Sequence, residues 1–171
     1  MNTLKAEKRS MDVKAKKLRR EGFVTGNLFG REIEGSIPLK FTKKEIEVLL
    51  KNNNKGSQVM LELDGKTYDA LIKEVDYNPL AHTVEEVDFQ ALVSNEMVHS
   101  TAEIILENEE KVMSGVLQDE LKEVAYKALP ADLVDKIKVD VAGMKIGDTL
   151  RVKDLEIAKN KNIHITTDLE A

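Results

Sequence analysis

The sequence has no cysteine and no tryptophan, and aromatic residues make up only 4% of its 171 positions. The lack of cysteine excludes disulfide bonds, thiolate catalysis and cysteine-ligated metals. No apolar run approaches the roughly 20 residues that a membrane-spanning helix needs. The N-terminal residues also lack the apolar core of a secretory signal. We therefore expect a cytoplasmic protein with no membrane partner.

Signatures of enzymes are equally scarce. The sequence has no Gly-x-Ser-x-Gly elbow, no phosphate-binding glycine loop and no dinucleotide fingerprint. An acidic group at Glu85, Glu86 and Asp88 has no second cluster that would complete a cation site or an acid–base pair. The histidines are scattered without metal-ligand spacing, at His82, His99 and His164. We predict no catalytic activity, no metal site and no cofactor.

What the sequence does have is an uneven distribution of charge. Residues 1–55 hold 14 Lys or Arg against 7 Asp or Glu, whereas residues 56–95 hold 2 against 8. Residues 96–171 hold 10 against 16. A basic head on an acidic body predicts a polyanion-binding site confined to one face, because the acidic remainder limits non-specific binding. Ordinary solvated surface charge is the alternative interpretation.

The basic head concentrates eight cations in sixteen residues: Lys5, Lys8, Arg9, Lys14, Lys16, Lys17, Arg19 and Arg20. Residues 14–21 are strong helix formers followed by Gly22, and only Ala15 and Leu18 are apolar, so the cations must face outward. The cluster matches an electrostatic footprint for nucleic-acid phosphates. Because exposed aromatic rings are few, recognition of a folded RNA by backbone and shape is favoured over stacking on single strands. A solvated basic helix would have the same composition, so both readings stay open.

The first half of the chain reads as about six short strands and two helices. A capping box at residues 42–45 opens the second helix, and Asp64-Gly65 is a residue pair typical of two-residue hairpins. Gly26 and Gly30 interrupt an early strand and predict a bulge or a tight bend. This pattern suits a small closed barrel or a sandwich. The expected strands are 3–9, 23–29, 36–41, 59–63, 67–75 and 83–89, and the expected helices are 14–21 and 42–50.

The strand pattern lapses at residues 91–96, so we expect one domain over 1–92 and a second over 96–171. The second domain is predicted to be β-rich or α+β. Residues 114–127 are ambiguous, with helical spacing through Val116, Leu117, Leu121 and Val124 but alternation near their end. Its expected strands are 98–106, 136–141, 149–152 and 163–167.

Six segments carry a family resemblance: residues 4–9, 16–22, 86–89, 128–133, 137–141 and 145–152. They resemble the long form of the bacterial general stress protein CTC family, whose members are large-subunit ribosomal proteins that bind 5S rRNA. The resemblance implies an N-terminal Greek-key β-barrel that docks on loop E of 5S rRNA, and a C-terminal β-rich domain. It also implies the large ribosomal subunit as partner rather than DNA, with another ribosomal protein as a candidate partner of the C-terminal domain.

The chain departs from the family pattern at four positions. Lys16 and Lys17 stand where the family carries paired arginines, and lysine lacks the bidentate fork that grips phosphate. Phe29 replaces a tyrosine, and Glu86 replaces a histidine, which places an anion where RNA should approach. The basic cluster and the resemblance together predict RNA binding at Lys8, Arg9, Lys14, Lys16, Lys17, Arg19, Arg20, Phe29 and Asp88. Of the contact positions that the resemblance implies, Arg9, Arg19 and Asp88 are retained. A stress-related paralogue that has lost its rRNA contacts and acts through protein contacts is the alternative hypothesis.

Overall fold

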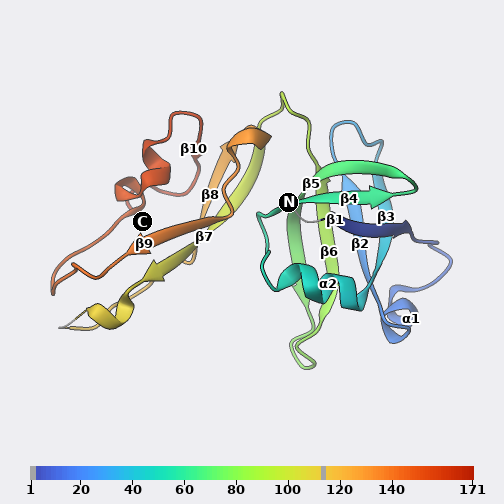
Figure 1. Cartoon of the computed structure of the whole chain (residues 1–171), viewed down its shortest axis with the longest axis horizontal. Helices are drawn as coiled ribbons and strands as arrows, with labels where there is room; N and C mark the ends of the chain where they lie inside the picture. Colours follow the sequence, from blue (N-terminus) through green and yellow to red (C-terminus); the bar gives the residue numbers. More distant parts are fainter. Residues whose placement is uncertain (1–2, 113–114) are drawn as a thin grey trace. The chain divides into compact units, whose positions relative to one another are not determined.

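A computed structural model describes residues 3–112 and 115–171. The chain divides into two compact units, of which the first reaches Ser94 and the second runs from Asn95 to Ala171 (Figure 1). Each unit is built on its own sheet, and the described helices are short. The predicted fold class, mainly β with a barrel followed by a β-rich unit, is confirmed.

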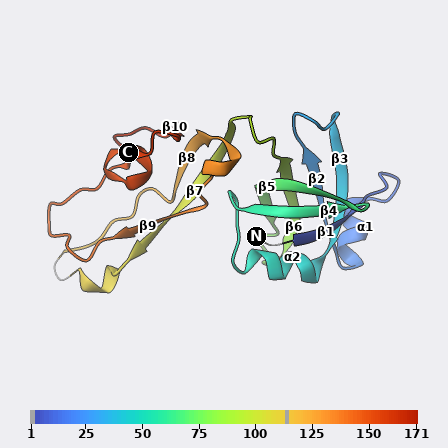
Figure 2. The same cartoon turned by 45° about the horizontal axis from the view of Figure 1, so that its top comes forward.

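The first unit is a closed six-stranded barrel (Figures 1 and 2). Its strand order is β1-β3-β2-β6-β5-β4, and parallel pairing of β1 with β4 closes the ring. Parallel pairing of β2 with β6 places two strands together that lie far apart in the sequence. The strands are β1 (Thr3–Lys8), β2 (Phe23–Phe29), β3 (Ser36–Thr42), β4 (Gln58–Leu63), β5 (Lys66–Tyr77) and β6 (Val84–Ala91).

Local sequence signals fix two elements of the barrel. The helix α2 (Lys43–Leu50) begins where the Thr42 hydroxyl accepts a hydrogen bond of 3.3 Å from the Glu45 backbone N–H. Its apolar face places Ile46 and Leu49 in the barrel core. At the β4–β5 turn Asp64 and Gly65 both have positive φ, 50° and 78°, as a type I′ hairpin requires. Both predictions are confirmed.

The helix α1 (Ala15–Arg20) lies against β2 in both views (Figures 1 and 2). Leu18 is its buried residue, at 5% exposure, so it anchors the helix to the barrel. The cationic side chains of Lys16, Lys17 and Arg20 are exposed, as predicted. The helix ends before Gly22, whose φ of 91° suits a residue without a Cβ.

Gly26 does not produce the predicted bulge, because β2 pairs with both β3 and β6 in unbroken register. A Cβ at this position would overlap the carbonyl oxygen of Val87 and press on the ring of Phe41. The glycine therefore serves close approach of β2 to β6. The chain bends instead at Gly30, where φ is 155° and β2 has ended.

The second unit contains a four-stranded sheet in the order β10-β8-β7-β9. β7 pairs antiparallel with β8 and parallel with β9. Its strands are β7 (Val98–Glu107), β8 (Glu123–Ala128), β9 (Lys136–Asp140) and β10 (His164–Ile165). The 3₁₀ turns described between them are η1 (Glu109–Lys111), η2 (Pro130–Asp132), η3 (Val152–Asp154) and η4 (Glu156–Lys159).

The structure resolves the ambiguity of residues 114–127. Their end forms the strand β8, as the alternation there indicated, whereas residues 115–122 form no helix although Leu117 and Leu121 pack on the core. Ser114 lies outside the described residues. One expectation is wrong: the strand 149–152 is absent, and the N–H groups of Val152 and Lys153 donate to Ala171 and Leu169 in a contact that forms no ladder.

Candidate nucleic-acid interface

Four cations of the predicted site form an exposed group on α1 and the residue before it, which we call the cationic face: Lys14, Lys16, Lys17 and Arg20. Within residues 3–112 and 115–171, their side chains form no hydrogen bond or ion pair. Basic residues in the last helical turn also complement the helix dipole, although α1 has no acidic residue in its first turn. The cationic face is therefore available to an external anion.

Arg19 lies on the same helix but is held against the barrel. Its Nε donates to the Glu85 carbonyl oxygen and its Nη2 to the Thr25 hydroxyl, both at 3.1 Å. The buried Thr25 hydroxyl in turn donates to the same carbonyl at 3.3 Å. Since a guanidinium has five N–H donors, three of them remain for a ligand. Arg19 thus fastens α1 over the junction of β2 and β6.

Arg9 and Lys8 follow each other at the end of β1 but differ in surroundings. Arg9 is half-buried, and its Nη2 donates to the Val13 carbonyl oxygen at 3.4 Å, a long contact. The Nε of Arg9 is buried, and no hydrogen-bond acceptor reaches it in the described chain. Lys8 pairs with Asp64 at 3.4 Å, and both side chains are about two-thirds exposed, so this pair is weak.

A group of carboxylates lies on the outer face of β5 and β6, which we call the acidic quartet: Glu74, Asp76, Glu86 and Asp88. In the β5–β6 pairing Glu74 is opposite Asp88 and Asp76 is opposite Glu86. Like charges in such cross-strand positions repel each other. The sheet therefore concentrates four anions on one face, where Glu86 lies within electrostatic reach of Arg9 and Arg19 and Glu74 pairs with Lys55 at 3.9 Å.

Burial and mutual repulsion raise the pKa values of two members of the quartet. For Glu86 the largest cause is burial, followed by the charges of Asp88 and Asp76, while Arg19 and Arg9 lower its pKa. For Asp88, burial raises the pKa and hydrogen bonds from Asn27 oppose it. The Asn27 side-chain amide donates to Asp88 at 3.4 Å. Glu86 is thus placed within electrostatic reach of both arginines.

Phe29 ends β2 on the same row as Thr25 and Asn27, and it is half-buried. It pairs with Ser36 on one side and with Gln90 on the other. The structure therefore brings Arg19, Phe29 and Asp88 to the β2–β6 junction, and it places Arg9, the residue after β1, within electrostatic reach of Glu86. Lys8 instead pairs with Asp64 at the β4–β5 turn.

Sequence reasoning did not identify Thr25 and Asn27 as partners of the site, nor Glu74 and Asp76 as part of its charge. Alternation along β5 places Glu74 and Asp76 on one face, and this signal was readable. Their position opposite Asp88 and Glu86 depends on register across a bulge between Ile72 and Glu74, which the sequence does not specify.

Other kinds of site find no support in the part of the chain that the structure describes. It contains no group of three or more His, Asp or Glu side chains arranged to hold a metal ion. No described helix is long and apolar enough to cross a membrane.

The two units match two family models. Residues 4–89 match the model described as the ribosomal L25p family, and residues 97–171 match the C-terminal domain of ribosomal protein TL5. Together the two matches span nearly the whole chain, and their division coincides with the two structural units.

Curated relatives agree with these matches. A "Large ribosomal subunit protein bL25" of Akkermansia muciniphila is 31% identical over 98% of this chain and 83% of its own length. A protein of the same name from Carboxydothermus hydrogenoformans is 33% identical over 88% of this chain and 80% of its own. One from Thermoanaerobacter sp. is 29% identical over 87% and 75%. The chain therefore belongs to the ribosomal L25p family, in the form that carries a TL5-type C-terminal domain.

Proposed function

We propose that the protein is a structural component of the large ribosomal subunit and binds 5S rRNA through the cationic face of its barrel, at loop E. As an L25p-family member it is a ribosomal structural protein rather than an enzyme, and its expected location is the cytoplasmic ribosome.

The cationic face supports this proposal most directly. Four cations that are exposed and unpaired in the described chain stand together on one short helix, in a protein whose net charge is −5. Unpaired cations repel each other, so their clustering lowers stability unless a polyanion neutralises them. Phosphates of a folded RNA provide that neutralisation, and each contact releases condensed counterions.

Arg19 and Arg9, which are not part of the cationic face, provide further hydrogen-bond donors for the RNA. Arg19 keeps three N–H donors while two hold α1 to β2 and β6. The buried Nε of Arg9 lacks a hydrogen-bond partner in the described chain, and a buried donor of this kind costs stability until an acceptor arrives. Both guanidiniums are therefore partly preorganised for phosphate or base acceptors, Arg19 at the β2–β6 junction and Arg9 after β1, next to β3.

Equilibrium binding of the full chain to 5S rRNA tests the proposal. Wild type should bind 5S rRNA in the presence of excess unrelated RNA, and Lys16→Gln with Lys17→Gln should weaken binding about tenfold or more. A matched control, Lys159→Gln with Lys161→Gln in the second unit, changes the net charge equally and should leave the affinity unchanged. Equal losses in both double variants would reject the cationic face as the site. No binding at low salt would favour the paralogue that acts through protein contacts.

A further inference from the structure

The second unit contains a groove that the proposed rRNA contacts do not use. It has a volume of about 480 Å³ and lies between residues 115–121 and residues 144–151. Its floor comes from the strands β7 and β9 and the residue that follows β9, through Leu106, Val139 and Val141. The groove therefore opens directly onto the hydrophobic core of the unit.

The two sides of the groove expose large apolar side chains. Val116 is 90% exposed, Ile146 is 74% exposed and Leu150 is 44% exposed, and all three line the groove. A single exposed aliphatic residue is ordinary, but several around one concavity are typical of an interaction site. Exposing them to water opposes the burial that stabilises the rest of the unit.

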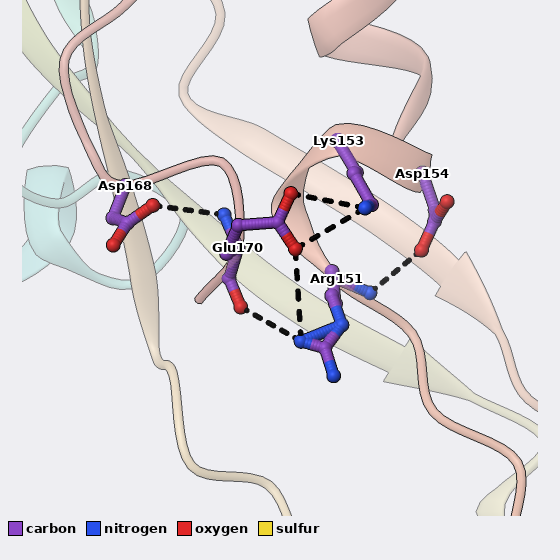
Figure 3. A network of polar contacts seen from close by, with 5 residues as sticks. All are labelled: Arg151, Lys153, Asp154, Asp168 and Glu170. Atoms are coloured by element: carbon purple, nitrogen blue, oxygen red, sulfur yellow. Dashed lines mark hydrogen bonds and ion pairs between the residues drawn. The ribbon is translucent and has the colours of Figure 1, made fainter.

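One end of the groove is fixed by a polar network around Glu170 (Figure 3). The Glu170 carboxylate accepts from the Lys153 ammonium at 3.0 Å and lies 3.9 Å from Arg151 Nη1, which also donates to the Glu170 carbonyl. Asp154 accepts from the Arg151 backbone N–H, and Asp168 accepts from the Glu170 N–H. These contacts hold the last residues of the chain beside η3, so this wall is preformed.

The charge around the groove indicates which kind of ligand it can bind. Four carboxylates line it, from Asp119, Glu120, Asp148 and Glu170, against two cations, Lys145 and Arg151. Asp119 pairs with Lys122 at 2.8 Å and Glu170 with Lys153 at 3.0 Å, so Glu120 and Asp148 are the lining carboxylates that form no ion pair in the described chain. Residues 96–171 as a whole carry 16 acidic and 10 basic residues. This field repels RNA phosphates and equally repels a second copy of the same unit. A positively charged polypeptide is complementary to it.

We propose that the groove binds a cationic segment of another protein of the large subunit, which places two or three apolar side chains between Val116, Ile146 and Leu150. This inference rests on the proposed ribosomal function and gives the second unit a task separate from 5S rRNA binding. Apolar contact at the floor would anchor the segment, and the carboxylates of Glu120 and Asp148 would pair with its cations.

Photo-crosslinking in assembled large subunits tests the proposal. A photoreactive amino acid is introduced in the full chain at Val116 or Ile146, with a matched control at Leu80, a 91% exposed residue of the first unit. Subunits carrying the chain are purified, irradiated and analysed by mass spectrometry. We expect both groove positions to link to one ribosomal-protein segment that is net positive and contains apolar residues, and Leu80 not to link to it.

Links from the groove to rRNA, to an acidic segment or to a second copy would overturn the inference, and so would the absence of links from both positions. A chain that does not enter the subunit would reject the proposed function and this inference together. As a second measurement, Ile146→Glu should leave the affinity for isolated 5S rRNA unchanged while the chain dissociates from the subunit about tenfold faster. Unchanged dissociation would also count against the groove.

Discussion

Replacing Glu86 by glutamine should strengthen binding to 5S rRNA. Glu86 is a half-buried carboxylate whose pKa is raised by burial and by the nearby Asp88 and Asp76. Phosphates that approach Arg19 and Arg9 would meet this additional negative charge. Two unit charges 4 Å apart interact by about 1 kcal/mol in water and about 4 kcal/mol near a protein surface. Because Glu86 is partly solvated, we expect about 1 kcal/mol, or roughly fivefold tighter binding.

The pH dependence gives this prediction a second readout. Folding raises the pKa of Glu86, and bound phosphates would raise it further, so binding takes up a proton. The affinity of wild type should therefore increase as pH falls from about 7 towards the pKa of Glu86, and this increase should be smaller in Glu86→Gln. The same raised pKa means that the stability from Glu86 is present at low pH and lost as pH rises through its folded pKa. Glu86→Gln should thus be more stable than wild type near neutral pH.

The assay is a fluorescence-anisotropy titration of labelled 5S rRNA with the full chain, at several pH values and constant ionic strength. Glu109→Gln, an exposed position in the second unit, removes the same charge and should have no effect. Glu86→His should tighten binding at least as much as Glu86→Gln, up to about 1–2 kcal/mol, since it permits a cation at this position. Unchanged affinity in both Glu86 variants, together with an unchanged pH profile, would refute the placement of RNA beside the acidic quartet.

Three further outcomes are expected. Arg19→Ala should weaken 5S rRNA binding by about 1–3 kcal/mol and also lower the free energy of unfolding measured in urea, because two hydrogen bonds are lost. Gly26→Ala should destabilise the barrel by about 2 kcal/mol or more, since a Cβ there overlaps the Val87 carbonyl oxygen; Gly143→Ala, which meets no atom within 4 Å, is the matched control and should change little. A fragment of residues 1–93 should unfold in one cooperative transition by circular dichroism, and a gradual transition would contradict independent folding.

The sequence predicted those elements whose signals are local. Thr42 and Glu45 define the start of α2, and Asp64-Gly65 fixes a hairpin, because each depends on residues only a few positions apart. The parallel pairing of β2 with β6 joins positions about 60 residues apart. This pairing brings the Val87 carbonyl oxygen close to Gly26 and so explains the glycine. The residues next to Gly26 in sequence do not show whether the glycine serves such a close approach or a bulge.

The difference between local sequence signals and contacts between distant residues also applies to the candidate site and to the second unit. The outward cations of α1 followed from a helix with two apolar residues, so the cationic face was predictable. The acidic quartet depends on register between β5 and β6, and sequence reasoning identified only Glu86 and Asp88 of it. Residues 149–152 have the composition of a strand, but only Val152 enters a regular element, the 3₁₀ turn η3, and its N–H donates to the carbonyl oxygen of Ala171.

The salt dependence of 5S rRNA binding tests the central claim most directly. If five to seven phosphates are neutralised, the logarithm of the affinity should fall with the logarithm of the salt concentration with a slope of roughly −4 to −6. Removing the charges of Lys16 and Lys17 should reduce the magnitude of that slope by about 1.4 to 1.8, because each lost phosphate contact contributes about 0.7–0.9. Binding whose slope is near zero, or is the same in wild type and the double variant, would contradict recognition of the RNA through the cationic face.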